Sequence, residues 1–501
     1  MDIKALLNKQ ALNFADKPAV VFRGRSINFQ QLKDASFALA NYLLKAGVQK
    51  GDRVAVFSPN TPAALVSIVG IFGVAATLVP LDFMLSQEEI IDFINHSKAK
   101  TLFAHFRRGI NLSQVKKHCP SLKKVIVWGK KTDSFSYWDD MVGKYEHNEP
   151  PSRIDNSDLA VILYTSGSTG HPKGVMLTFG HLDNPIKAIE YCLEMSKEDV
   201  LLCPGIPFSH IGGLDYIFLM LHFSSSLVLM ERFQPYKFLK NIQEYKATLF
   251  WIVPAMYVAI LSLKDSDKFD LSSLRHAVVF GAPSSPVLLK KFHKMCPNAY
   301  LLNGWGMTET SAPNAVLPLG SKRIESVGKF VPWMKAEIVD EDGNKLGPGQ
   351  KGELRVKGEG VMLGYYKEPQ LTAAVLAKDG WLKTGDIAYY DEDNLFYIVG
   401  RIKDMIKVGG EIVFSTEVEE KIHRHSKVKE AAVVGVTDKL RGEVPKAFIV
   451  VKETESLTEK ELKEFLKKSL AHFKMPHYFE FVDELPKTRT GKIDKKKLKD
   501  Y

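Results

Sequence analysis

The hydrophobic positions of the chain alternate between short apolar runs and stretches with apolar residues three and four apart. Residues 159–164 and 226–230 form continuous apolar runs, as expected for strands buried in a sheet. Between 235 and 245 the apolar residues share one helical face, and 249–253 reads as the next strand. An early hairpin is expected around the turn at 23–25. This rhythm of strand, helix and strand predicts α/β architecture up to residue 400.

The pattern changes near residue 400. An apolar run at 395–399 precedes the charged turn Gly400-Arg-Ile-Lys-Asp404, and short strands with two helical patterns follow. In the second half of this region, Thr458 and Glu461 have the spacing of a capping box. We therefore expect a large N-terminal domain of packed βα subdomains at 1–400, a connection at 401–404 and a small α+β domain at 405–501.

The segment 61–81 carries no charged residue and is long enough to span a bilayer. Pro62 suits a helix start, while Gly70, Gly73 and Pro80 interrupt a longer helix. A buried helix that runs into a short strand at 75–79 accounts for the segment without lipid. The amino terminus also lacks the apolar core of a signal peptide, so a cytoplasmic location without a transmembrane segment is expected.

Composition narrows the class of protein. With 501 residues, 45% hydrophobic and 25% charged, the chain suits a soluble protein of at least two domains. The four cysteines show no CxxC spacing, which argues against a zinc site or a disulfide framework. The net charge of +10 would favour binding of anionic small molecules or of nucleic acid. The sequence contains no recognised nucleic-acid-binding motif.

A loop rich in glycine and hydroxyl residues follows the strand at 159–164. It reads Thr165-Ser-Gly-Ser-Thr-Gly-His-Pro-Lys-Gly174 and does not satisfy the Walker A pattern. Glycine lets backbone N–H groups turn toward a phosphate, and hydroxyls and a lysine add donors. The candidate phosphate-binding residues are Thr165, Ser166, Gly167, Ser168, Thr169, Gly170 and Lys173.

This loop resembles the signature of the adenylate-forming superfamily, which includes acyl-CoA synthetases, peptide-synthetase adenylation domains and luciferases. Further motifs similar to those of the family follow in order over nearly the whole chain: Gly281-Ala-Pro283, Asn303-Gly-Trp-Gly-Met-Thr-Glu309, Trp381-Leu-Lys-Thr-Gly-Asp386, Gly400-Arg-Ile-Lys-Asp404 and Pro486-Lys-Thr-Arg-Thr-Gly-Lys492. Two positions depart from the family. Trp305 stands where a tyrosine is usual, and His477 stands where an arginine often occurs.

The resemblance implies roles for the motif residues. The residues that would bind ATP or AMP include Gly281, Ala282, Pro283, Asn303, Gly304, Trp305, Gly306 and Met307. The turn at 281–283 would border adenine and the acyl pocket, and Trp305 would stack on adenine. An indole face suits base stacking. Thr308 would contact the α-phosphate, and Glu309 with Thr165 would hold Mg²⁺. Asp386 and Arg401 would bind the ribose, with Arg401 also within reach of phosphate, and Lys492 would be the catalytic lysine.

The resemblance also implies an acyl pocket, a hinge and a coenzyme A site. His210, in a segment similar to the family's P-x-x-H, would be a catalytic residue beside the substrate carboxylate, as Lys492 and Thr308 would be. It would also line the acyl pocket with Ile211, Gly212, Phe280, Gly304 and Gly306. Lys403 matches the hinge about which the mobile C-terminal domain would swing. Lys407, Gly409 and Gly410 would then line the pantetheine tunnel, and Arg441 and Lys446 would meet the nucleotide end.

The expected activity is that of an ATP-dependent ligase, which forms an acyl-adenylate and then an acyl-CoA thioester. Gly304 and Gly306 would leave a deep pocket floor, so we expect a medium-chain, cyclic or aromatic acid rather than acetate. The partners are the acid, ATP with Mg²⁺ and coenzyme A, and a homodimer is left open.

Several alternatives remain open from the sequence. A stand-alone adenylation enzyme would load a carrier protein, although no fused carrier domain is expected after Lys492. Amino-acid-activating relatives place an aspartate near the substrate amine, and Asp215 is the nearby candidate, without the usual aromatic context. The remaining alternatives are a luciferase and a non-catalytic nucleotide sensor. The presence of Lys492, Glu309 and Asp386 argues against the sensor.

Overall fold

The computed structural model describes residues 1–131, 134–165, 173–281, 286–408, 411–438, 440–453, 455–488 and 492–499. Within these ranges, helices and strands are mixed throughout and build four β-sheets with helices packed against them. The α/β architecture predicted from the hydrophobic pattern is therefore confirmed.

The two largest sheets contain the buried strands that the apolar runs predict. The nine-stranded sheet has the order β16 (Lys329–Phe330), β15 (Ala315–Val316), β14 (Tyr300–Trp305), β13 (His276–Val279), β12 (Leu249–Ile252), β10 (Val200–Cys203), β11 (Ser226–Leu229), β1 (Pro18–Phe22) and β2 (Arg25–Asn28). The eight-stranded sheet has the order β19 (Gly364–Tyr365), β9 (Lys173–Thr178), β8 (Leu159–Thr165), β4 (Thr77–Leu81), β3 (Arg53–Phe57), β5 (Thr101–His105), β6 (Lys124–Trp128) and β7 (Ser136–Tyr137). The predicted early hairpin is β1 and β2, which pair antiparallel.

Two smaller sheets follow in the last third of the chain. The four-stranded sheet is antiparallel and has the order β17 (Met334–Val339), β18 (Gly352–Gly358), β20 (Leu382–Tyr390) and β21 (Phe396–Arg401). The five-stranded sheet has the order β23 (Glu411–Phe414), β22 (Met405–Val408), β25 (Gly442–Val451) and β24 (Val428–Asp438), with β26 (Tyr478–Phe481) paired to β25. Buried apolar residues up to Phe396 form two clusters, and those from Ile406 onward form two others. Cores that divide in this way give each part of the chain its own apolar interior.

The uncharged stretch at 61–81 forms a helix and a strand inside the protein. Thr61 caps α3 (Pro62–Gly73) with its hydroxyl, and β4 follows. In the described ranges no helix is long and apolar enough to cross a membrane. The helix predicted at 235–245 is also present, as α9 (Pro235–Tyr245).

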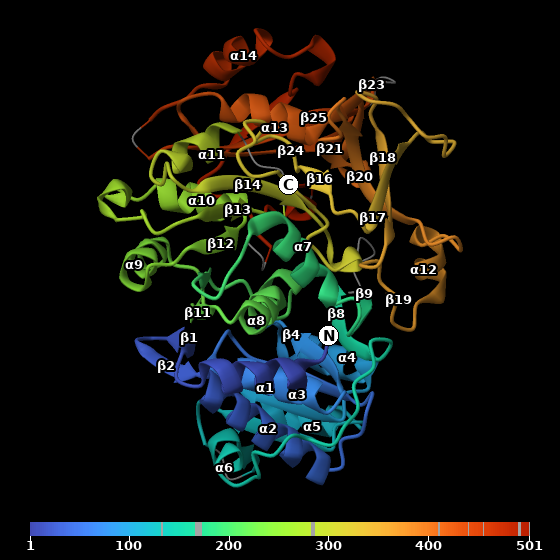
Figure 1. Cartoon of the computed structure of the whole chain (residues 1–501). Coiled ribbons are helices and arrows are strands. Elements are labelled where there is room, and N and C mark those ends of the chain that lie inside the picture. Colours follow the sequence, from blue (N-terminus) through green and yellow to red (C-terminus); the bar gives the residue numbers. More distant parts are fainter. Residues whose placement is uncertain are drawn as a thin grey trace.

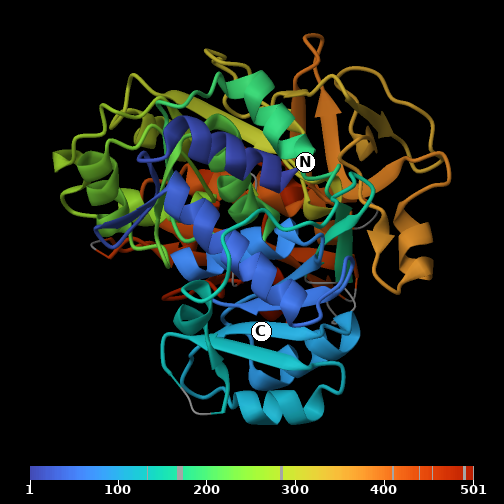
Figure 2. The same cartoon turned by 60° about the horizontal axis from the view of Figure 1, so that its bottom comes forward.

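Most of the other helices surround the large sheets. They are α1 (Ile3–Phe14), α2 (Phe29–Lys45), α4 (Gln87–Ser97), α5 (Leu112–His118), α6 (Trp138–Val142), α7 (Asp183–Leu193), α8 (Ile211–Phe223), α10 (Pro254–Leu261), α11 (Pro286–His293) and α12 (Pro369–Val375). The C-terminal helices are α13 (Ser415–His423), α14 (Glu459–Lys467) and α15 (Lys495–Lys499). Figure 1 shows α13 and α14 at the end opposite the blue N-terminal helices, and Figure 2 shows the blue helices side by side.

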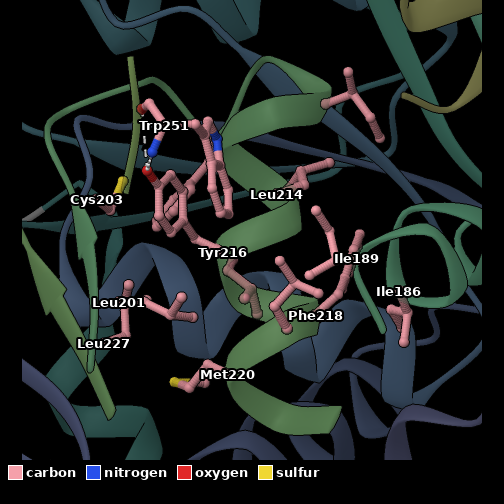
Figure 3. Packing of buried hydrophobic residues seen from close by; sticks show 14 of the residues in the cluster. Ile186, Ile189, Leu201, Cys203, Leu214, Tyr216, Phe218, Met220, Leu227 and Trp251 are labelled. Carbon is pink, nitrogen blue, oxygen red and sulfur yellow. Dashed lines mark hydrogen bonds between the residues drawn. The ribbon is translucent and has the colours of Figure 1, made fainter. Parts of the chain in front are cut away.

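Helix α8 lies deep in the core. Figure 3 shows its apolar side chains between the strands that carry Leu201 and Leu227 and the helix that carries Ile186 and Ile189. Tyr216 stacks on Trp251 with ring centroids 3.6 Å apart, and the Tyr216 hydroxyl accepts a hydrogen bond of 3.0 Å from the Trp251 backbone N–H. This packing fixes the axis of α8, whose first residues reach the cavity described next.

Candidate active site

The carboxyl ends of several parallel strands open into one cavity of about 3570 Å³. Strands β12, β13 and β14 are parallel neighbours, and the residues that end or follow them, Val253, Gly281 and Trp305, line the cavity. Strand β8 of the other large sheet ends at Thr165, which lines it too. Ligands of α/β proteins bind at this edge of a sheet.

Most of the residues predicted from the motifs lie around this cavity. The lining contains Thr165, His210, Ile211, Gly212, Phe280, Gly281, Asn303, Gly304, Trp305, Gly306, Met307, Thr308, Glu309, Asp386, Arg401, Lys403 and Lys492. The predictions for Ser166, Gly167, Ser168, Thr169, Gly170, Ala282, Pro283, Gly409 and Gly410 fall outside the described residues. Residues separated by more than 300 positions in the sequence thus face one space.

Asp386 is held by two partners at the centre of the site. It pairs with Arg401 across β20 and β21, and the Arg401 Nε lies 2.8 Å from one carboxylate oxygen. The Trp305 indole N–H donates to the other oxygen at 2.8 Å. Asp386 is only 3% exposed, so these charge-assisted bonds fix the direction of its carboxylate.

Lys492 reaches the same region from the C-terminal part of the chain. Its backbone N–H donates to the Thr488 hydroxyl at 3.2 Å. Gly281 has φ +90°, and a Cβ at that position would lie 3.4 Å from the Lys492 Cε. Glycine at 281 therefore meets the need for a left-handed backbone, and the distance shows that the lysine packs against this turn.

The surroundings of Lys492 make its charged form less stable than it would be in water. The residue contacts solvent inside the cavity, yet the protein around the ammonium group lowers its pKa to about 8, first by desolvation and next through the charge of Arg401. The carboxylates of Asp386 and Glu309 act in the opposite direction. A bound polyanion would favour the charged form, so the site is suited to binding negative charge.

Glu309 and Thr165 provide oxygen atoms at another part of the cavity. Glu309 is buried and accepts a hydrogen bond of 3.0 Å from the Tyr365 hydroxyl. The Lys173 ammonium lies over the Tyr365 ring, 5.0 Å from its centroid. A carboxylate and a hydroxyl fit Mg²⁺, which takes one or two protein ligands together with phosphate oxygens. In the described residues no group of three or more His, Cys, Asp or Glu could hold a metal alone.

His210 is the N-cap residue of α8. Its Nε2 lies 4.0 Å from an Asp82 carboxylate oxygen, and burial, with Lys492 nearby, lowers its pKa to about 4 in spite of Asp82. The imidazole is therefore neutral at neutral pH and can accept or donate a hydrogen bond.

Asp82 and Tyr365 are examples of residues at or beside the site that the sequence predictions do not name. Asp82 directly follows the parallel strand β4 and lines the cavity. Its place at the carboxyl end of a buried strand could have indicated that it belongs to the site. Tyr365 reaches Glu309 because β19 pairs with β9, a long-range pairing for which the local sequence holds no signal.

The expectation of a deep floor left by Gly304 and Gly306 is wrong. A Cβ on Gly304 would collide with the Phe280 ring, and one on Gly306 would lie 2.5 Å from the Ala312 Cβ. Side chains from other segments already occupy the space that the two glycines leave. The glycines line the cavity, but they do not deepen it.

The described candidates for coenzyme A lie elsewhere. Lys407 and Arg441 flank the paired residues Val408 and Gly442 of β22 and β25, and Lys446 forms an ion pair of 2.7 Å with Glu480. Arg441 hydrogen-bonds to His477. None of the three lysine and arginine residues belongs to the cavity lining, whereas Lys492 does. Their role stays a prediction.

Comparison with known proteins places this geometry in a family. The model of the AMP-binding enzyme family matches residues 7–366, and that of the AMP-binding enzyme C-terminal domain matches residues 417–492. A long-chain-fatty-acid–CoA ligase of Bacillus subtilis is 32% identical over 99% of this chain and 94% of its own length. Luciferin 4-monooxygenase of Photinus pyralis is 31% identical over 95% of this chain and 89% of its own.

A solved structure extends the likeness to three dimensions. The crystal structure of an anthranilate CoA ligase in complex with anthranoyl-AMP has a TM-score of 0.94 and 26% identity, and the match covers 100% of this chain and 97% of the other. Sequence, fold and the converging motifs agree. The chain belongs to the family of AMP-binding enzymes.

Proposed function

We propose that this AMP-forming acid–CoA ligase activates a medium-chain, cyclic or aromatic carboxylic acid with ATP and transfers the acyl group to coenzyme A. The observation that carries the proposal is the convergence of Lys492, Asp386, Trp305 and Glu309 on one cavity. Ile189, Ile211, Leu219 and Met307 give this cavity an apolar part, as acyl pockets require. The anthranilate ligase that it resembles acts on an aromatic acid.

In the first half-reaction the substrate carboxylate attacks the α-phosphorus of ATP and pyrophosphate leaves. No general base is required, because the carboxylate is ionised at pH 7. Lys492 orients the carboxylate and neutralises charge that builds on the α-phosphate, with Thr308 as a further donor. Mg²⁺ bound by Glu309, Thr165 and phosphate oxygens would add charge neutralisation.

The nucleotide is held by its base and its sugar. Trp305 stacks on adenine, and Asp386 with Arg401 binds the ribose hydroxyls. The phosphate-loop residues and Lys173 complete the phosphate site.

In the second half-reaction the thiol of coenzyme A attacks the acyl carbonyl and AMP leaves. We place the hinge at Lys403, which lies in the short 3₁₀ segment Ile402–Asp404 between β21 and β22. Rotation there would remove Lys492 and bring Lys407, Gly409 and Gly410 to the tunnel, with Arg441 and Lys446 at the nucleotide end. His210 would stand at the tunnel mouth. The domain limits, a homodimer and a cytoplasmic location belong to this proposal too.

A panel of acids tests the substrate class. Acetate, butyrate, hexanoate, octanoate, benzoate and phenylpropanoate are compared by pyrophosphate release and by thioester formation. Each buried CH₂ contributes about 0.8 kcal/mol, so kcat/KM should rise roughly fourfold per carbon until the pocket is full. A profile that peaks at acetate contradicts the proposal, and adenylate without thioester would favour a carrier-protein acceptor.

Adenylation should be lost at alkaline pH. Because the lowered pKa of Lys492 is about 8, its ammonium loses the proton as pH rises through that value, and kcat/KM for ATP in pyrophosphate release should fall. Initial rates from about pH 6.5 to about pH 9.5 measure this decrease in kcat/KM. Any residual activity of Lys492→Arg should not decrease at alkaline pH, because a guanidinium does not titrate in this range. A wild-type profile that stays flat would contradict the role of Lys492.

Trp305 should contribute to ATP affinity in two separable ways. Trp305→Ala removes the stacking face and should raise KM for ATP about tenfold, since base stacking is worth about 1–3 kcal/mol. Trp305→Tyr should change KM for ATP only slightly. Trp305→Phe keeps a stacking ring but loses the indole N–H that donates a hydrogen bond to Asp386. Steady-state kinetics at saturating acid measures KM. A wild-type KM in Trp305→Ala, or equal use of GTP and ATP, would contradict the adenine site.

A further inference from the structure

The segment after β18 joins the strand that follows the phosphate loop to the turn that carries Glu309. The Met362 backbone N–H donates to the Glu309 carbonyl oxygen at 2.9 Å, and the Tyr366 N–H donates to the Gly174 carbonyl oxygen at 2.7 Å. Between these two contacts, β19 pairs antiparallel with β9, the strand after the phosphate loop. The backbone of Tyr365, in β19, is therefore held between two parts of the proposed ATP site.

The side chain of Tyr365 binds one carboxylate oxygen of Glu309. Its hydroxyl donates to Oε1 at 3.0 Å, and the bond is buried. In the part of the chain that the structure describes, no residue hydrogen-bonds to Oε2. Glu309 lines the cavity, and its charge acts on Lys492. The hydrogen bond to Oε1 therefore leaves Oε2 as the oxygen that can bind a cation in the cavity.

The Tyr365 ring itself has little freedom to turn. The residue is buried, and its backbone N–H donates to the Thr372 hydroxyl at 2.9 Å. The Lys173 ammonium lies over the ring, and this cation–π contact holds it from the side of β9. Mg²⁺ requires nearly ideal octahedral geometry, so the direction of a carboxylate that binds it affects the affinity. A rigid donor beside Glu309 supplies such a fixed direction.

We propose that Tyr365 is a positioning residue of the adenylation step, whose hydroxyl holds the Glu309 carboxylate in the direction that binds Mg²⁺. Tyr365 does not belong to the cavity lining, whereas Glu309 does, so the tyrosine acts through the carboxylate and not on the substrates. The inference rests on the proposed function, which assigns Glu309 to Mg²⁺. Hydrogen-bond partners of metal ligands typically change metal affinity by about tenfold to a hundredfold when they are removed.

Binding of Mn²⁺ to the full-length enzyme with α,β-methylene-ATP tests the inference. This nucleotide cannot release pyrophosphate, and the electron paramagnetic resonance signal of free Mn²⁺ gives the bound fraction, with the nucleotide alone as the blank. Tyr365→Phe keeps the ring and its contact with Lys173 but loses the hydroxyl. It should weaken Mn²⁺ binding by about tenfold to a hundredfold, while binding of the nucleotide without Mn²⁺ should not change.

The Mg²⁺ dependence of the reaction gives a second measurement. In Tyr365→Phe, the Mg²⁺ concentration that gives half the maximal rate of pyrophosphate release should rise in proportion to the loss of affinity, and excess Mg²⁺ should restore much of the rate. Thioester formation from synthetic acyl-adenylate should not change, because in the proposed mechanism Mg²⁺ acts in the first half-reaction. A hydroxyl with a purely structural role would affect both half-reactions without rescue by Mg²⁺.

Tyr366 offers a matched control, because it is the next residue and its hydroxyl donates to the Ser97 carbonyl oxygen at 3.5 Å, away from Glu309. Tyr366→Phe should change neither Mn²⁺ affinity nor Mg²⁺ dependence. Glu309→Gln should itself weaken Mn²⁺ binding, and the addition of Tyr365→Phe should then weaken it no further, since the hydroxyl acts through that carboxylate.

The outcomes separate the inference from the proposed function. If Glu309→Gln loses Mn²⁺ affinity and Tyr365→Phe does not, the inference is overturned and the proposed function stands. The inference is also overturned if the effects of the two substitutions add, or if Tyr365→Phe loses its folded state, measured by Tm, because the hydroxyl would then act elsewhere or on stability. If Glu309→Gln binds Mn²⁺ as tightly as wild type, the metal site of the proposed function is wrong, and the inference with it.

Discussion

Replacement of Lys492 by alanine should lower the rate of acyl-adenylate formation by a factor of about 10²–10³, the usual effect of removing one preorganised charge donor. Lys492 lines the cavity, and its side chain lies next to Gly281. Thioester formation from synthetic acyl-adenylate should persist, because in the proposed mechanism the lysine acts in the first half-reaction alone. Single-turnover assays of the two half-reactions measure the difference.

Lys463 offers a matched control for this experiment. It lies on α14, pairs with Glu459 one helical turn away, and does not belong to the cavity lining. Lys463→Ala removes the same charge and should leave both half-reactions unchanged. Equal loss of the two half-reactions in Lys492→Ala would contradict the model in which the lysine leaves the site between them.

Lys403→Pro should give the opposite result, with adenylation kept and transfer to coenzyme A reduced by about a hundredfold or more. Proline fixes φ near −65°, so residue 403 could no longer absorb a rotation. Position 403 lies in the first turn of a 3₁₀ segment, where backbone N–H groups have no acceptor within the helix and proline is tolerated. Rapid-quench measurement of acyl-adenylate and of thioester in the same reaction separates the two steps.

Lys403→Ala removes the side chain but keeps a flexible backbone, and it should retain transfer. Lys403 lines the cavity and its charge acts on Lys492, so this control also reveals any electrostatic contribution. Normal overall turnover in Lys403→Pro would place the hinge at another residue.

Much of the fold follows from local patterns in the sequence. The helix at 235–245 and the strand at 159–164 appear where the apolar spacing predicts them, because each buries one continuous face. Trp305 and Gly281 meet at one cavity because each lies at the carboxyl end of a parallel strand. The strand order itself could not be read from the sequence, since it depends on pairings such as that of β1 with β11.

The parts that the sequence could not predict depend on contacts between distant segments. Trp305 was expected to stack on a base, but nothing in its motif indicates that its N–H reaches Asp386 on another sheet. The hydroxyl of Tyr365 on Glu309 is a further example. Such contacts depend on how whole sheets pack, and local spacing carries no information about that packing.

In the proposed acyl pocket, the filled spaces beside Gly304 and Gly306 would make selectivity for acid size depend on pairs of residues. Position 304 shares one volume with Phe280, and position 306 shares another with Ala312. Close-packed interiors tolerate exchanges that conserve volume far better than single enlargements. A mutant library that varies either glycine alone should therefore yield mostly misfolded protein, whereas one that enlarges residue 304 while it shrinks residue 280 can redistribute the same volume. Directed evolution of this enzyme toward new acids would have to change both residues of such a pair together.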